Sequence, residues 1–224
     1  MYGKILIVKT LILSQFSYLL SCLPSPIDAT FTEINNLIMK FIRSNRSAQK
    51  LSKNILQMEK NKAGLDLTLI HDHNSGLKIS WVKRLTENSF KGWKSLINFS
   101  LPLNNNDFWK CNFKKNHTSP ILDYYSNIPK FWREVIIEWA NYNFREPTTT
   151  NEFLSQPIWF NSLILNTSNK LIFYKNYYDS GIFRISDIVI GNRFLTYNEL
   201  IRAFPNIRTD FLKYLGLLSM VLSH

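Results

Sequence analysis

The chain has 224 residues and a formal net charge of +11, from 27 lysines and arginines against 16 acidic residues. This length allows one large domain or two small ones, and a hydrophobic content of 45% excludes a chain too polar to bury a core. So large a positive charge is typical of a protein with a polyanionic partner, either nucleic acid or an anionic membrane surface, although lysine-rich codon usage is an alternative source.

The first segment, MYGKILIVKTLILSQFSYLLSCLPSP, has the apolar character of a secretion signal. However, Lys9 and Ser14 interrupt its apolar runs, so that it has neither the roughly 7–15 apolar residues of a signal nor the roughly 20 of a membrane span. Its hydroxyl side chains recur at helical spacing: Thr10, Ser14, Ser17 and Ser21. An apolar stripe opposes them: Ile5, Val8, Ile12, Phe16, Leu19 and Leu23. We predict an amphipathic helix that packs on a core and stays on the mature protein; a targeting segment is the alternative.

A second helix is predicted after Pro26, because Thr30 and Glu33 have the spacing of a capping box. One apolar face follows: Phe31, Ile34, Leu37, Ile38, Phe41 and Ile42. The two helices are therefore expected to form a hairpin. The charge is concentrated just after it, between Lys40 and Lys62, where Glu59 is the one acidic residue among seven cations: Lys40, Arg43, Arg46, Lys50, Lys53, Lys60 and Lys62. This basic window has no sustained apolar face and is expected to be exposed.

The remainder of the chain is predicted to be mostly helical. Leu77, Trp81, Val82 and Leu85 mark one helix, and residues 98–119 are polar and irregular enough to be a linker or an excursion. The second half is rich in aromatic residues, and its helical patterns have apolar residues at these positions: Trp132, Val135, Ile136 and Trp139, then Phe211, Leu215, Leu218 and Leu222. A further capping box runs from Thr196 to Glu199.

Few residues have the spacing of a catalytic or metal site. His71-Asp72-His73 is the one histidine-rich spot, and with no third ligand nearby it is better interpreted as a polar helix N-terminus than as a zinc site. Glycine-rich phosphate loops and a G-x-S-x-G elbow are absent from the sequence. The two cysteines, Cys22 and Cys111, cannot make a disulfide framework, and Cys22 is expected to be a buried thiol. Most of the six tryptophans lie in apolar patterns, which favours core packing over base stacking.

Several stretches in order resemble the reverse transcriptases of LINE-type non-LTR retrotransposons, in the region after the polymerase palm. They are YGKILIVKTLILSQFSYLLSCLP, INNLIMKFI, GLDLTLIHDHNSGLKISWVKRL with a following GWK, QPIWFNSLI, IFYKNYYDSGIFRISDIV, FLTYNELIRAF and TDFLKYLGLLS. The chain departs from the family pattern at Arg43, where an aromatic residue is usual, and at Ala63, where a glycine is usual.

The resemblance implies a mainly α fold, with a thumb-like helical bundle with a basic surface at residues 1–97 and a mostly helical post-thumb region at 120–224, on either side of the linker or irregular excursion at 98–119. A thumb grips the backbone of the template–primer duplex without reading its sequence. The residues expected to bind that RNA or DNA backbone are Lys40, Arg43, Arg46, Lys50, Lys53, Lys78, Lys83 and Arg84.

The family's catalytic carboxylates lie in the palm, which this chain does not contain, so we expect no catalysis of its own, no cofactor and no metal. It is interpreted as the C-terminal remnant of such a polymerase, intracellular rather than secreted or bound to a membrane, with an upstream palm as a partner where the full element is made. The alternatives are a truncated fragment of an active RNA-directed DNA polymerase and an inert or structural product without a selected function.

Overall fold

The structure is a computed structural model, and it describes residues 2–43, 52–87, 94, 101, 103, 105–118, 121–122, 127–208 and 211–222. The fold is mainly α-helical, which confirms the predicted fold class. The chain forms two compact units: unit 1 contains Met1–Arg84 and Pro129–Glu138, and unit 2 contains Leu85–Ile128 and Trp139–His224. The predicted segment ends near residues 97 and 119 lie outside the described residues, so that division stays a prediction.

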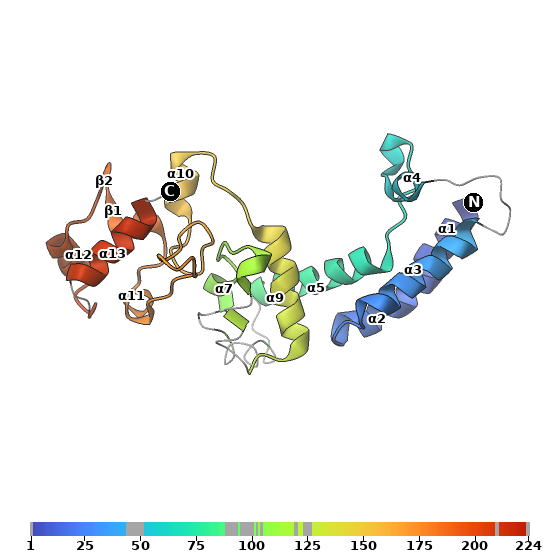
Figure 1. The fold of residues 1–224 in the computed structure, drawn as a ribbon, viewed down its shortest axis with the longest axis horizontal. Helices are drawn as coiled ribbons and strands as arrows, with labels where there is room; N and C mark the ends of the chain where they lie inside the picture. The colour runs from blue at the N-terminus through green and yellow to red at the C-terminus, as the bar shows by residue number, and fades with distance from the viewer. Residues whose placement is uncertain are drawn as a thin grey trace. The chain divides into compact units, whose positions relative to one another are not determined.

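One continuous helix begins the chain, in three parts: α1 (Tyr2–Ile7), the π-helical η1 (Val8–Ile12) and α2 (Leu13–Cys22) (Figure 1). The i→i+5 bonds of a π-helix place one residue more in the turn than an α-helix does, which shifts the buried stripe by one position. Leu20 is therefore buried, whereas Leu19 and Leu23 are about half exposed. The predicted helix is confirmed, but the last part of its predicted apolar face is wrong.

The hydroxyl groups on this helix donate to the helix's own backbone. Thr10 donates to the Leu6 carbonyl at 2.8 Å, and Ser14 donates to the Thr10 carbonyl at 2.6 Å. The helix has 21 residues, and an 18-residue stretch of it has a mean hydropathy of 1.7 and is 22% buried, so that by length and composition alone the helix could cross a membrane. A hydroxyl group that is hydrogen-bonded to its own helix backbone costs less to place in an apolar environment than an unbonded one. The prediction that this segment packs on a core and stays on the mature protein therefore stays a prediction.

The second helix, α3 (Asp28–Arg43), completes the expected hairpin with the first one (Figure 1). It begins two residues before the predicted capping residue Thr30, which lies inside the helix. Phe31, Ile38 and Ile42 form its buried face. Cys22, expected to be buried, is exposed because it is the last residue of α2 and the chain turns away after it.

The rest of unit 1 packs beside the hairpin. It contains α4 (Lys53–Gln57), η2 (Lys60–Lys62), α5 (Ile70–Thr86) and the first part of α9 (Lys130–Asn143). The extended segment before α5 lies against α4, since the Leu67 amide donates to the Leu56 carbonyl at 2.7 Å. The apolar faces predicted for α5 and α9 are confirmed, and Trp81 meets Trp132 edge to face with 5.5 Å between ring centroids.

Two glycines of unit 1 provide a matched test of this packing. A Cβ on Gly64 would lie 2.0 Å from the Met58 carbonyl oxygen, whereas a Cβ on the exposed helical Gly76 would meet nothing within 4 Å. We expect Gly64→Ala to lower the free energy of unfolding by about 1–3 kcal/mol through overpacking. Gly76→Ala should raise it by about 0.5–1 kcal/mol through helix propensity. Denaturant titration followed by circular dichroism measures both, and a Gly64→Ala protein as stable as the wild type would contradict the structure here.

Unit 2 combines short helices with turns and a small hairpin (Figure 1). Its elements, besides the end of α9, are α7 (Asn105–Phe108), η3 (Lys115–His117), α10 (Thr150–Ser155), α11 (Lys175–Asp179), η4 (Ile185–Ile188), β1 (Val189–Ile190), β2 (Arg193–Phe194), α12 (Tyr197–Ala203) and α13 (Phe211–Leu222). The antiparallel strands β1 and β2 turn at Gly191, whose φ of +59° favours glycine.

Aromatic side chains dominate the core of unit 2. Trp159 and Tyr177 are fully buried, with 6.1 Å between their ring centroids. The described part of the predicted linker also enters this core, because Phe108 and Phe113 have 0% and 1% of their surface exposed. Two large apolar residues thus anchor the described second half of this segment in unit 2, and the interpretation of residues 98–119 as a linker or an irregular excursion stays a prediction.

Helix α13 buries a different stripe from the predicted one. Tyr214, Leu217 and Val221 are buried, whereas Phe211 and Leu222 are 52% and 64% exposed. The helix is apolar on nearly all sides, so that periodicity alone cannot select the face that packs. The buried face contains Tyr214, whose hydroxyl donates to the Leu195 carbonyl. Burial raises the pKa of Tyr214 to about 12.

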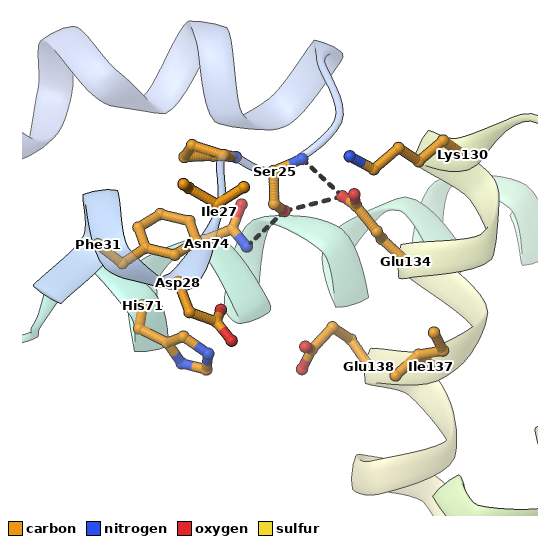
Figure 2. A pocket seen from close by; sticks show the side chains of 11 residues that line it. Ser25, Ile27, Asp28, Phe31, His71, Asn74, Lys130, Glu134, Ile137 and Glu138 are labelled. Carbon is orange, nitrogen blue, oxygen red and sulfur yellow. Dashed lines mark hydrogen bonds between the residues drawn. The ribbon is translucent and has the colours of Figure 1, made fainter.

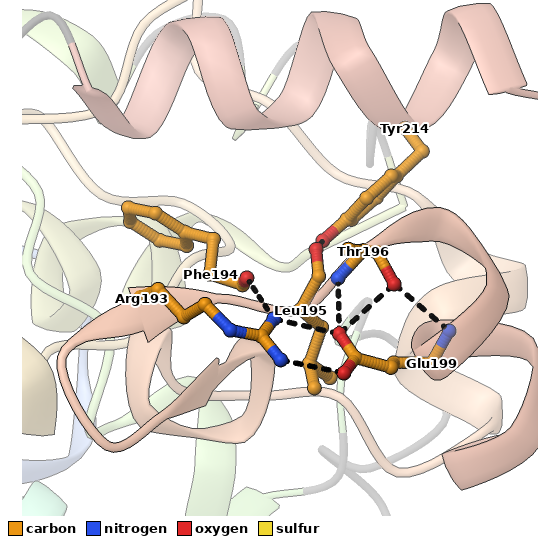
Figure 3. A network of polar contacts seen from close by, with 6 residues as sticks. All are labelled: Arg193, Phe194, Leu195, Thr196, Glu199 and Tyr214. Atoms are coloured by element: carbon orange, nitrogen blue, oxygen red, sulfur yellow. Dashed lines mark hydrogen bonds and ion pairs between the residues drawn. The ribbon is translucent and has the colours of Figure 1, made fainter.

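The predicted capping box at α12 is confirmed, and an arginine joins it (Figure 3). One Glu199 carboxylate oxygen accepts from the Thr196 backbone N–H at 2.7 Å and from its hydroxyl at 2.9 Å. The other accepts from Arg193 at 2.6 Å. These donors hold the pKa of Glu199 well below its usual value of 4.5.

The depressed pKa makes α12 sensitive to acid. A carboxyl group whose pKa is lower in the folded state stabilises the fold above its unfolded pKa, and this contribution is lost as pH falls below about 4.5. We expect Glu199→Gln to lower the melting temperature at pH 6 and to lower it progressively less toward pH 3. Asp179→Asn, at an exposed carboxylate outside the network, is the control. Melting curves at several pH values measure the difference, and an effect of Glu199→Gln that does not change with pH would contradict the prediction.

Candidate nucleic-acid interface

The first two residues of the predicted interface lie near the end of α3. Lys40 and Arg43 are both exposed there, where the helix carbonyls favour cations. Arg46 and Lys50 lie outside the described residues. Lys53 begins α4, but its side chain is also outside what the structure describes.

Three lysines that sequence reasoning did not assign to the interface lie at the same end of the hairpin. Lys4 donates to the Phe41 carbonyl at 2.8 Å, which brings the start of α1 to the end of α3. Lys60 reaches the Tyr2 hydroxyl at 3.3 Å, and Lys62 follows it in η2. Together with the two cations at the end of α3, these three lysines form a group that we name the cationic end. Its members are Lys4, Lys40, Arg43, Lys60 and Lys62. The gathering of residues 40 to 62 was visible in the sequence, whereas the addition of Lys4 depends on the antiparallel hairpin.

Two carboxylates lie close to the cationic end. Glu59 pairs with Lys62 at 3.6 Å, and Asp66 pairs with Lys9 at 2.6 Å. The Lys9 ammonium holds the pKa of Asp66 below its usual range. The cations of the described part of this end therefore outnumber the carboxylates, and its potential is positive.

Lys83 and Arg84 occupy the other end of unit 1. Helix α5 begins beside Asn35, in the middle of α3, where the Ile70 amide donates to the Asn35 side chain at 3.1 Å. It then runs toward the turn of the hairpin, where the Trp81 indole N–H donates to the Ser21 carbonyl at 2.7 Å. Since α3 alone has 16 residues and rises about 1.5 Å per residue, the predicted cations form two groups separated by roughly 20 Å.

Lys78 corrects the prediction of a surface cation. Its side chain is fully buried, and its ammonium donates to the Leu23 carbonyl at 2.6 Å. The Glu134 carboxylate lies 3.3 Å away, and the centroid of the Phe131 ring lies 3.9 Å from Lys78 Nζ. Burial lowers the pKa of Lys78, and the Glu134 charge opposes that shift. Lys78 therefore holds α5, α9 and the hairpin turn together and cannot reach a phosphate.

Other candidates for chemistry have structural positions. His71 and Asp72 lie in the first turn of α5, as the polar N-terminus interpretation predicts. His73 contacts the Ser17 hydroxyl at 2.8 Å, and burial lowers its pKa. Within the described ranges no group of three or more His, Cys, Asp or Glu side chains is placed to hold a metal ion. Trp109 and Trp159 are buried, which confirms core packing for them.

Comparison of the chain with family models, curated proteins and solved structures finds no match. The resemblance to retrotransposon polymerases is therefore carried by the sequence motifs alone.

The buried ion pair can be tested by removing one partner. We expect Lys78→Met to lower the free energy of unfolding by about 3 kcal/mol, since it leaves Glu134 without its cation and the Leu23 carbonyl without a donor. The matched change Lys83→Met, at an exposed lysine of the same helix, should shift it by no more than about 0.5 kcal/mol. Denaturant unfolding measures both, and equal effects of the two variants would contradict a structural role for Lys78.

Proposed function

We propose that this chain binds the backbone of RNA or DNA without sequence specificity, as the thumb and post-thumb part of a LINE-type non-LTR retrotransposon reverse transcriptase, and has no catalysis of its own. The convergence of exposed cations at the cationic end carries this proposal. Lys40 and Arg43 in the last turn of α3 and Lys60 in η2 are exposed together at one end of the hairpin. Such a surface neutralises phosphates and releases counterions, which gives affinity but no base readout.

The cationic end is a better candidate than the opposite end of unit 1. Lys83 and Arg84 lie at the end where α3 starts and α9 packs, and this region also holds the carboxylates of Asp28 and Glu138. These negative charges reduce the attraction of a phosphate backbone to that end. We therefore assign the main contact to Lys40 and Arg43 and expect a smaller contribution from Lys83 and Arg84.

Two matched double variants test this assignment. Both Lys40→Gln/Arg43→Gln and Lys83→Gln/Arg84→Gln remove two exposed positive charges near the end of one helix, so they change net charge equally. On duplex DNA the logarithm of the dissociation constant changes with the logarithm of salt by about 0.9 per neutralised phosphate. We expect the first variant to flatten this slope by about 1.8 if each residue contacts one phosphate, and the second to flatten it much less.

Fluorescence anisotropy with labelled duplexes of unrelated sequence, over a series of salt concentrations, gives the slopes. A quadruple change of Lys170, Lys175, Arg202 and Arg208, all exposed in unit 2, controls for general loss of charge. Equal slopes for the two double variants, or a strong preference for one duplex sequence, would sink the assignment. Circular dichroism should show unchanged folding, because exposed charges contribute little to stability.

A further inference from the structure

A pocket of about 440 Å³ opens within unit 1, between the start of α3, the first turns of α5 and the α9 helix (Figure 2). Its volume lies in the range of small-molecule sites, roughly 300–1,000 Å³. Ile27, Phe31 and Ile137 form apolar parts of its wall. The pocket is at the opposite end of the hairpin from the cationic end and plays no part in the proposed nucleic-acid contact.

Two carboxylates line the pocket without a hydrogen bond or ion pair to any described residue: Asp28 and Glu138. Figure 2 shows the Glu138 side chain extending from α9 across the pocket toward Asp28 and His71. Glu134 differs from them, because it accepts from the Ser25 amide and hydroxyl, each at 2.8 Å, and pairs with Lys78. Lys130 lies on the Glu134 side of the pocket, away from Asp28. The part of the pocket between Asp28 and Glu138 is therefore negative.

The side-chain carbonyl oxygen of a buried asparagine that lines the same pocket has no hydrogen-bond donor in the described structure. Asn74 is 5% exposed, and its amide N–H donates to the Ser25 hydroxyl oxygen at 3.0 Å. The hydroxyl proton of Ser25 goes to Glu134, so the amide cannot be reversed to let its oxygen accept from Ser25. The Asn74 carbonyl oxygen is left without a partner in the described structure. A buried acceptor without a donor is costly, and a ligand that donates hydrogen bonds would satisfy it.

These groups define the chemistry of a ligand. Two carboxylates and a carbonyl accept hydrogen bonds, so the complementary group is a positively charged donor, and the apolar wall fits an alkyl stem. A planar guanidinium offers five donors in a fixed geometry, which suits several acceptors around one cavity. A metal ion fits less well, since no group of three or more ligating side chains is found in the described ranges, and the carboxylates repel an anion.

We propose that this pocket binds an organic cation with an alkyl stem and a guanidinium or primary ammonium head. The head lies between Asp28 and Glu138 and donates to Asn74, and the stem lies against Ile27 and Phe31. The same chemistry is offered by a free small molecule and by an arginine or lysine side chain of a peptide. The proposal does not rest on nucleic-acid binding, whose main contact is assigned to the cationic end.

The experiment is isothermal titration calorimetry of the full chain with n-butylguanidinium, and separately with a blocked Gly-Arg-Gly tripeptide. Asp28→Asn/Glu138→Gln should weaken binding about tenfold or more, because two charge-assisted hydrogen bonds are lost. The matched variant Glu33→Gln/Glu59→Gln removes two exposed carboxylates of unit 1 outside the pocket, and it should keep the affinity within about twofold. In an NMR titration the Asn74 side-chain amide should shift on addition of butylguanidinium.

The two probes distinguish the sources. Binding of butylguanidinium alone supports a free small molecule as the ligand, whereas equal binding of the tripeptide supports a side chain of a partner. Failure of both probes would overturn the proposal, as would equal weakening by the two double variants or binding of inorganic phosphate in their place. Because the readout contains no nucleic acid, its failure would leave the proposed function unaffected.

Discussion

The buried contact between Lys78 and Glu134 is the interaction on which the arrangement of unit 1 depends. Two charges removed from water are tolerated only when their remaining hydrogen-bonding groups are satisfied. Lys78 meets this condition through the Leu23 carbonyl, and Glu134 meets it through Ser25. The pair thus fixes the hairpin turn, α5 and α9 at once, although these elements are distant in sequence. The hydrophobic stripes of the helices could accept several relative rotations, whereas this polar network accepts one.

The burial of Lys78 could not be predicted from the local sequence of α5. The pattern of Leu77, Trp81 and Leu85 predicts the inward face of α5, and in the structure Leu85 is buried and Leu77 and Trp81 are half-buried. Lys78 follows Leu77 directly and belongs to the edge of that face, where a lysine ordinarily extends to solvent. Its burial requires a carboxylate on α9, Glu134, which is 56 residues later in the sequence and lies beside Lys78 in the structure. Because no local pattern in the sequence indicates such a partner, the sequence predicts a surface cation, whereas the Lys78 side chain is fully buried.

Backbone irregularity limited the prediction in the first helix. A 3.6-residue period correctly places Ile5 and Val8 in the core, up to the point where η1 begins. One additional residue in that turn then replaces Leu19 by Leu20 on the buried side. In α13 the period itself carries little information, because nearly every position is apolar. The capping box at Thr196 and Glu199, by contrast, was predictable since all its partners lie within four residues.

The candidate sites follow the same division between local and distant information. The basic window predicts cations near Lys40 from composition alone, but the antiparallel hairpin is needed to bring Lys4 beside them. The pocket could not have been found from the sequence, because Asp28, Asn74 and Glu138 are separated by tens of residues and are unremarkable in their own segments. The turn that the Lys78–Glu134 pair fixes brings them together. In this turn the Ser25 hydroxyl donates to Glu134 and accepts from the Asn74 amide N–H. The Asn74 carbonyl oxygen is thereby left without a donor. The interaction that holds unit 1 together thus also creates the one buried acceptor in the described part of the pocket that a ligand could satisfy.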